Sequence, residues 1–162
     1  MSLIYLLLGA NLGDRFAQMS KAFTEIEMQI APITKYSSLY QTDAWGKEKE
    51  PPYLNQVVCL ETNLTPTELL KAINKIEDKL GRTRKIKWES RLIDIDILFY
   101  DNAIIDSPDL TIPHPYLDQR KFTLVPLAEI AAKLRHPVLR KSIQTLLAEL
   151  NDPLDVKRIT PK

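Results

Sequence analysis

The sequence has a single cysteine, Cys59, which excludes an intramolecular disulfide framework and a cysteine-based zinc site. It has no apolar run long enough to span a membrane. Its first residues lack the basic region and cleavage pattern of a signal peptide, so we expect a reducing, cytoplasmic setting. The net charge is only +1, whereas a general binder of polyanions carries a large excess of positive charge. We therefore expect neither nucleic acid nor a membrane as a partner.

A length of 162 residues suits one domain with one substantial core, so we interpret residues 1–162 as a single domain. Hydrophobic residues make up 44% of the chain and charged residues 27%, which is typical of globular proteins. We expect the chain after about residue 153 to be loosely held, because terminal segments commonly are. We also expect a monomer.

Apolar spacing predicts strands over residues 3–8, 33–40, 53–62 and 91–100. A helix capped by Asp14 and ended by Pro32 is predicted between the first two strands, and another runs from the capping box of Thr65 and Glu68 to Gly81. A hairpin partner for the last strand is expected at 103–105, followed by helices that begin at Pro126 and Ser142. This order predicts an α+β, ferredoxin-like sandwich: a mainly antiparallel sheet with helices on one face and extra C-terminal helices.

The strand over residues 91–100 carries an unusual pair of acidic side chains. Alternation places one apolar set on the core face: Ile93, Ile95, Ile97 and Phe99. Asp94 and Asp96 then share the other face, which we expect to be free for a ligand. Two such carboxylates repel each other by about 3 kcal/mol at an effective dielectric near 20. Mg²⁺ between them would reverse that penalty, whereas an edge strand that discourages aggregation is the simpler alternative.

Two polar segments precede this strand in the chain. Residues 41–52 are predicted to form a long polar loop that contains Trp45. A loop of this length is often a lid or a binding loop, and a plain connection between two strands is the alternative. Residues 82–91 hold five basic residues, one glutamate and Trp88, a pattern typical of solvated surface. Continuity with the aspartate strand instead favours phosphates bound through Mg²⁺.

Residues 9–14 lack the Gly-Lys-Ser/Thr of a P-loop. His114 lies between two prolines, where a structural role is commoner than a catalytic one.

Several short motifs occur in an order that resembles one enzyme family. They are Leu-Gly-Ala-Asn-Leu-Gly-Asp (8–14), Tyr-Leu-Asn (53–55), Gly-Arg-Thr-Arg (81–84), Arg-Leu-Ile-Asp-Ile-Asp-Ile-Leu (91–98), and Pro-His-Pro (113–115) followed by Arg120, Phe122 and Pro126-Leu127. The chain is similar to the 6-hydroxymethyl-7,8-dihydropterin pyrophosphokinases of folate biosynthesis. The resemblance implies transfer of pyrophosphate from ATP to the hydroxymethyl group of the pterin, with release of AMP.

The resemblance also implies roles for individual residues. Asp94 and Asp96 would bind two Mg²⁺ ions and, with Arg82, Arg84 and Arg91, form the catalytic group. The residues implied for ATP are Asn74, Glu77, Arg82, Arg84, Trp88, Arg91, Thr111, His114 and Arg120. Those implied for the pterin are Thr42, Trp45, Tyr53, Asn55 and Phe122. His114 is expected to donate a hydrogen bond to phosphate rather than to act as a general base.

The sequence departs from the family pattern at two places. Many members carry Arg-Trp-Gly-Pro-Arg before the aspartate strand, where this chain has Lys-Trp-Glu-Ser-Arg at 87–91. Asn74 stands where some members have Gln. Two other functions remain as alternatives. A two-metal nucleotidyltransferase would release pyrophosphate, but the Gly-Ser helix start of that class is absent. A non-catalytic ferredoxin-like module would bind nucleic acid through the basic loop. The near-neutral net charge of the chain counts against this alternative.

Overall fold

The computed structural model describes residues 1–42, 52–81 and 92–160. In chain order the elements are β1 (Ser2–Ala10), α1 (Arg15–Gln29), β2 (Ile33–Tyr36), β3 (Leu39–Thr42), β4 (Tyr53–Thr62), α2 (Pro66–Leu80), β5 (Asp94–Tyr100), β6 (Ile105–Asp106), β7 (Thr111–Ile112), a 3₁₀ turn (Leu117–Gln119), α3 (Lys121–Ala131), α4 (Ile143–Glu149) and β8 (Val156–Ile159). Among the described residues, no helix combines the length and apolar character needed to cross a membrane.

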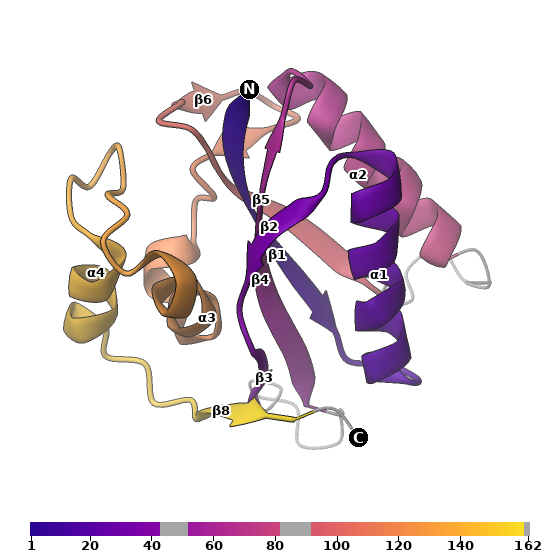
Figure 1. The fold of residues 1–162 in the computed structure, drawn as a ribbon. Coiled ribbons are helices and arrows are strands. Elements are labelled where there is room, and N and C mark those ends of the chain that lie inside the picture. The colour runs from indigo at the N-terminus through magenta and orange to yellow at the C-terminus, as the bar shows by residue number, and fades with distance from the viewer. Residues whose placement is uncertain (43–51, 82–91, 161–162) are drawn as a thin grey trace.

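The central sheet confirms the predicted ferredoxin-like arrangement. Its strands lie in the order β5-β1-β4-β3-β8, β2 also pairs with β4, and the pairings are antiparallel. Helices α1 and α2 cover one face, as Figure 1 shows on the right of the sheet. The alternate apolar side chains of β1 and β4 pack there against Ile26 of α1 and Ile73 of α2. Burial of this apolar surface is the main favourable contribution to the fold.

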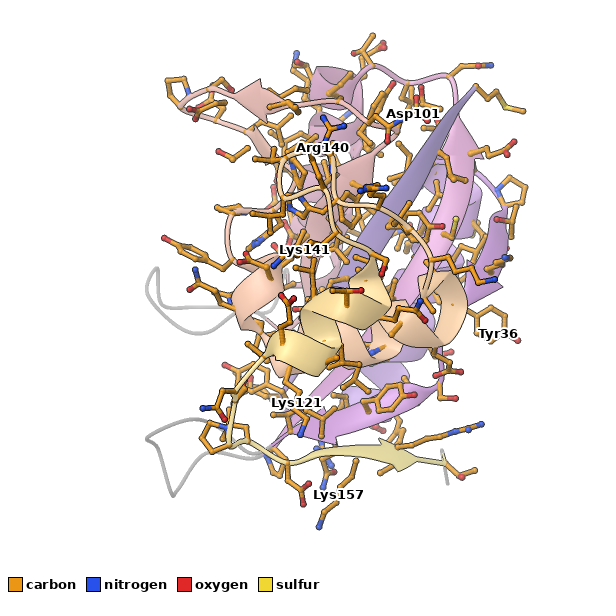
Figure 2. The ribbon with its side chains drawn as sticks, turned by 90° about the vertical axis from the view of Figure 1, so that its left-hand side faces the viewer. Tyr36, Asp101, Lys121, Arg140, Lys141 and Lys157 are labelled. Atoms are coloured by element: carbon orange, nitrogen blue, oxygen red, sulfur yellow. The ribbon has the colours of Figure 1, made fainter. Side chains whose placement is uncertain are left out.

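The opposite face is not free over its whole area, which corrects our expectation. Helices α3 and α4 pack on it (Figure 1), and Figure 2 looks onto this side, with Lys121 at the start of α3 and Lys157 on β8. A second core joins Leu7, Val57 and Leu98 of the sheet to Leu124 of α3 and Leu146 of α4. The reason is that part of this face is apolar and needs a cover. Only the end of the face with polar side chains remains outside that core.

A β-bulge in β5 makes one predicted orientation wrong. Leu6 of β1 is opposite Ile97, but the preceding residue Tyr5 is opposite Phe99, so Leu98 is an extra residue in β5. Ile97 therefore packs on the α1/α2 side, whereas Leu98 and Phe99 both belong to the core under α3 and α4. The extra residue leaves Asp94 and Asp96 on the predicted, shared face.

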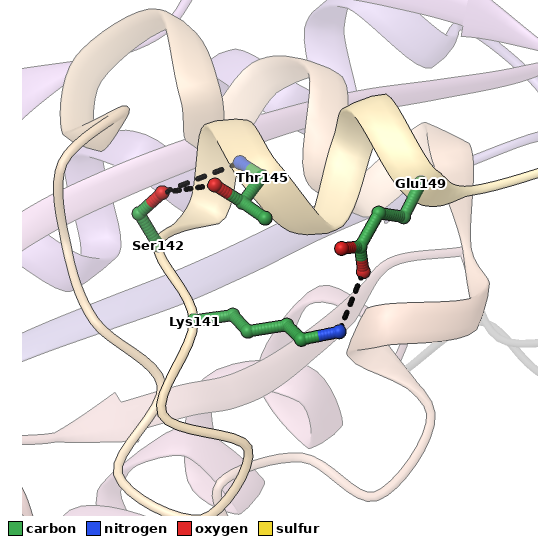
Figure 3. A network of polar contacts seen from close by, with 4 residues as sticks. All are labelled: Lys141, Ser142, Thr145 and Glu149. Atoms are coloured by element: carbon green, nitrogen blue, oxygen red, sulfur yellow. Dashed lines mark hydrogen bonds and ion pairs between the residues drawn. The ribbon is translucent and has the colours of Figure 1, made fainter.

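The helix starts follow local capping rules. Asp14 accepts a hydrogen bond from Ala17 N (3.1 Å), and Thr65 and Glu68 form the predicted capping box of α2. Ser142 caps α4 by accepting from Thr145 N (3.3 Å; Figure 3). The start predicted at Pro126 is wrong, because α3 begins at Lys121 and contains that proline. The proline removes one intrahelical hydrogen bond, and burial of its neighbours against the sheet offsets the loss.

Three further expectations are corrected by pairings between distant segments. The strand predicted over 33–40 is split at Ser37, whose N–H donates to Val57 O (2.8 Å) and whose hydroxyl accepts from Val57 N (3.0 Å). The segment near 105 pairs with β7 instead of β5. The chain past residue 153 is not loose as a whole, since β8 pairs with β3 along its full length.

Candidate active site

A line of polar and small residues, called the polar line below, crosses four strands on the α3/α4 side of the sheet. Asp94 of β5 is opposite Gly9 of β1, Gly9 is opposite Asn55 of β4, and Asn55 is opposite Tyr40 of β3. Directly opposed residues project from the same face of a sheet, so these residues form one continuous surface. Thr42, paired with Tyr53, and Asp96 lie on the same face beside it. The register thus brings together predicted metal and pterin residues.

Two buried polar atoms on this surface have no hydrogen-bond partner. Asn55 and Thr42 are each 4% exposed, and Asn55 Oδ1 and Thr42 Oγ1 lack partners. Asn55 Nδ2 donates to Leu8 O (3.3 Å), which orients the amide and leaves its oxygen for another donor. An unsatisfied buried polar group costs about 1–3 kcal/mol. These atoms are therefore suited to the polar edge of a ligand.

The predicted aromatic residues lie on the same side of the sheet. Tyr53 is half-buried on β4, and Phe122 is half-buried near the start of α3. The Arg120 guanidinium lies 5.5 Å from the centre of the Phe122 ring and 5.2 Å from that of Tyr116. Such cation–π contacts hold Arg120 beside Phe122. The start of α3 therefore presents one flat aromatic surface and one fixed positive charge.

A cleft of about 270 Å³ lies along the outer edge of β5, the edge away from β1. Asp96, Thr111 and His114 line it, and Leu70 of α2 forms part of its apolar wall. The family resemblance implied the first three of these residues separately, as a metal ligand and two ATP contacts. The structure thus brings these three residues together in one cleft, beside the strand that carries Asp94 of the polar line.

His114 is held in one orientation by backbone contacts. The backbone N–H of His114 donates to Leu98 O (3.1 Å), and the ring Nδ1 accepts from Tyr116 N (3.2 Å). Burial lowers the pKa of His114, Asp96 opposes that shift, and Arg120 adds to it. A neutral imidazole that accepts at Nδ1 carries its proton on Nε2. His114 is thus suited to donate a hydrogen bond through Nε2, and its contact with phosphate stays a prediction.

Glu77 has a role that the sequence did not indicate. It is only 9% exposed, and its Oε2 accepts a hydrogen bond from Ile95 N (2.9 Å). This bond ties Ile95, the residue between Asp94 and Asp96 at the beginning of β5, to α2. Asn74, about one turn earlier on α2, is exposed. Contacts of Glu77 and Asn74 with ATP stay a prediction.

The aspartate pair suits Mg²⁺ better than it suits a metal ion that is enclosed by protein side chains alone. Asp94 is exposed and Asp96 half-buried, so solvent and ligand oxygens can reach both. Within the described ranges, no group of three or more His, Cys, Asp or Glu side chains could enclose a metal ion. Mg²⁺ commonly takes one or two carboxylates and completes its shell with water and phosphate oxygens. The donor set present is of that kind.

Five predicted residues lie outside the described residues: Trp45, Arg82, Arg84, Trp88 and Arg91. Arg15, which no motif singled out, also makes contacts near the site. Arg15 Nη1 donates to Pro52 O (2.7 Å) and to Gln41 Oε1 (3.3 Å). It therefore links α1 to β3 beside Thr42 and to the chain just before Tyr53. Its position directly after the motif at 8–14 was the available signal.

Comparison with known proteins identifies the family. The sequence model of the 7,8-dihydro-6-hydroxymethylpterin-pyrophosphokinases matches residues 5–132. The chain belongs to this family. An Aquifex aeolicus 2-amino-4-hydroxy-6-hydroxymethyldihydropteridine pyrophosphokinase is 41% identical over 149 residues, 92% of each protein. A Bacillus subtilis protein with the same description is 40% identical over 134 residues, 82% of this chain and 80% of its own length.

Solved structures agree with the fold. The Plasmodium falciparum HPPK-DHPS structure with pterin and p-hydroxybenzoate matches with a TM-score of 0.74 at 18% identity. The match covers 91% of this chain and 43% of that one, so this pyrophosphokinase chain spans under half of the larger protein. The family match at 5–132 includes every predicted site residue, from Thr42 to Phe122, and ends before α4 and β8.

Proposed function

We propose that the polar line and the β5-edge cleft together form the active site of this pyrophosphokinase. The chain transfers pyrophosphate from ATP to the hydroxymethyl group of 6-hydroxymethyl-7,8-dihydropterin in folate biosynthesis, and AMP is the other product. The observation that carries the site assignment is that Asp94, Gly9 and Asn55 are consecutive partners across three strands. A phosphate-binding end and a heterocycle-binding end are thereby joined on one surface.

The pterin end binds a flat, polar heterocycle. Asn55 Oδ1 and Thr42 Oγ1 are buried without partners, so a ring edge with N–H groups can satisfy them. Tyr53 and Phe122 cover the faces of the ring, since aromatic side chains pack well against planar ligands. Burial of the ring here would place its hydroxymethyl group toward Gly9 and the aspartates.

The phosphate end combines acidic and basic groups. Asp94 and Asp96 would hold two Mg²⁺ ions, which when bound neutralise phosphate charge and align the displacement at the β-phosphorus. His114 donates through Nε2, and Arg120 supplies a fixed positive charge beside Phe122. Arg82, Arg84 and Arg91 are proposed to bind the remaining phosphate oxygens. Catalysis then depends on the orientation of the two substrates, with water excluded.

Substitution of a metal ligand tests this assignment. Asp96→Asn removes one carboxylate charge from a half-exposed position and should abolish AMP formation while the thermal unfolding temperature stays close to that of the wild type. Asp106→Asn, an exposed aspartate on β6, is the matched control and should leave turnover unchanged. Near-normal turnover by Asp96→Asn would remove the aspartates from the active site. Formation of pyrophosphate or ADP in place of AMP would contradict the reaction.

We further propose that the chain acts as a monomer, because the residues of the polar line and of the β5-edge cleft come together within one chain. Light scattering at assay concentration should give the mass of one chain. A stable dimer would contradict this part of the proposal.

A further inference from the structure

Glu129, near the end of α3, makes an extensive contact with the sheet. Its carboxylate accepts two hydrogen bonds from Ser38 N, at 3.0 Å to Oε1 and 3.1 Å to Oε2, and Oε2 also accepts from Ser38 Oγ (3.0 Å). Oε1 accepts a fourth bond from the Tyr40 hydroxyl (2.6 Å). Hydrogen bonds to a carboxylate are stronger than those between neutral groups. Glu129 therefore joins α3 firmly to the segment that leads into β3.

The charges at this contact are well matched. Burial alone would raise the pKa of Glu129, but the bonds from Tyr40 and Ser38, with the nearby charge of Arg158, hold the pKa below its usual value. Burial raises the pKa of Tyr40 to about 12, and the bond to Glu129 contributes to the shift. At neutral pH the tyrosine hydroxyl is thus the donor and an ionised carboxylate is the acceptor.

Both ends of this contact belong to elements of the proposed pterin site. Tyr40 is the last member of the polar line, directly opposite Asn55, and Thr42 follows it on the same face of β3. On α3, Phe122 precedes Glu129 by about two helical turns, so both lie on the same side of the helix. The contact therefore connects the floor of the site, β3 and β4, to the helix that carries its aromatic cover.

The C-terminal strand supports the contact from the other side. Arg158 of β8 is paired with Tyr40 of β3, and Val156 is paired with Thr42. Asp152, just before this strand, accepts a hydrogen bond from Lys121 N (3.3 Å) at the start of α3. Both elements that Glu129 joins are thus also held by a segment beyond the region that the family model matches.

We propose that Glu129, together with Tyr40, is a positioning residue that fixes the gap between α3 and the sheet into which the pterin ring fits. This inference rests on the proposed function, since it takes the pterin to bind between Phe122 and the β3–β4 surface. A fixed gap lowers the ordering cost when the ring binds. ATP binds at the β5 edge, away from this contact, so loss of the contact should weaken pterin binding selectively.

The experiment compares Glu129→Gln and Tyr40→Phe with the wild type in the full-length chain. Glutamine keeps the size of the side chain but presents an amide donor to donor groups, and phenylalanine removes only the hydroxyl. Calorimetric titration with the pterin, in the presence of a non-hydrolysable ATP analogue, should show dissociation constants raised about tenfold. The KM for ATP should stay within about twofold of the wild-type value. Because the two residues act as one unit, the double variant should be little worse than either single variant.

Glu149→Gln is the matched control. Glu149 lies on the neighbouring helix α4, where its Oε2 pairs with Lys141 Nζ at 2.8 Å (Figure 3), and no candidate site residue takes part in that contact. The control should bind both substrates as the wild type does. Equal loss of pterin and ATP binding in Glu129→Gln and Tyr40→Phe would overturn the positioning role, because a general structural defect would affect both.

Asn55→Ala distinguishes failure of this inference from failure of the proposed function. If Asn55→Ala weakens pterin binding but Glu129→Gln and Tyr40→Phe do not, the positioning role is overturned and the site stands. If Asn55→Ala leaves pterin binding unchanged, the pterin binds elsewhere, and both the proposed site and this inference are overturned.

Discussion

Gly9 and Asn55 are opposite one another on β1 and β4, and the amide of Asn55 occupies the space that a side chain at Gly9 would need. A Cβ atom at Gly9 would lie 2.9 Å from Asn55 Nδ2, closer than real Cβ contacts allow. Glycine at this position therefore lets the amide lie flat across β1. It also keeps the surface open between Asn55 and Asp94, where the proposed pterin and phosphate ends meet.

Gly9→Ala should displace the Asn55 amide and weaken pterin binding. We expect the KM for the pterin to rise about tenfold, which corresponds to about 1.4 kcal/mol, with a smaller change for ATP. Steady-state kinetics with each substrate varied would measure both constants. In an Asn55→Ala background the same substitution should have little further effect, because the displaced group is gone. Full additivity of the two substitutions would contradict a role that acts through Asn55.

Glu77→Leu should destabilise the fold. The substitution removes the acceptor of the Ile95 N–H and leaves a buried donor unpaired, at a cost of about 1–3 kcal/mol in the free energy of unfolding. Urea unfolding would measure the loss. Asp78→Leu, on the exposed side of the same helix, is the control and should cost less. Unchanged stability with a raised KM for ATP would instead show that Glu77 serves the nucleotide alone.

Acid should destabilise the protein in part through His136. This residue is 6% exposed, and its Nδ1 accepts from Val138 N (3.2 Å) and Leu139 N (3.1 Å). Burial lowers the pKa of His136 below its ordinary value of 6.5, with Asp118 opposing the shift. The unfolded chain therefore takes up the proton first, and the free energy of unfolding falls as the pH drops below 6.5.

Comparison of wild type and His136→Asn between about pH 7 and 5 would test this, because an asparagine oxygen can accept the same bonds without titrating there. The variant should show a shallower loss of stability with falling pH. His114→Asn is measured in parallel, since the pKa of His114 is also lowered by burial. The carboxylates whose pKa values are lowered, such as Glu129, lose their contribution only at more acidic pH. Identical pH slopes in wild type and His136→Asn would contradict the prediction.

The local features of the fold could be predicted from sequence, and those set by distant pairing could not. The caps at Asp14, Thr65 and Ser142 depend on residues three positions away, so their signals are complete within a short window. The bulge that turns Phe99 depends on the register with β1, and β8 depends on pairing with β3 more than a hundred residues earlier. Alternation alone contains neither fact.

The same distinction holds in the site. The aspartate alternation correctly predicted that Asp94 and Asp96 share one face, and the register shows that Asn55 and Thr42 lie on the same face. Their binding of phosphate and pterin stays a prediction. No local pattern marks Glu129, since its partners Ser38 and Tyr40 are 91 and 89 positions away. The structural role of Glu77 was missed for a similar reason, because its partner Ile95 lies on another element. Supporting contacts of this kind become visible only in the folded chain.

A crystal structure of the complex with the pterin, Mg²⁺ and a non-hydrolysable ATP analogue tests the central claim most directly. We expect the ring edge within hydrogen-bond distance of Asn55 Oδ1 and magnesium between the phosphates and the carboxylates of Asp94 and Asp96. A pterin bound elsewhere, with Asn55 Oδ1 still unpartnered and both aspartates remote from the nucleotide, would contradict it.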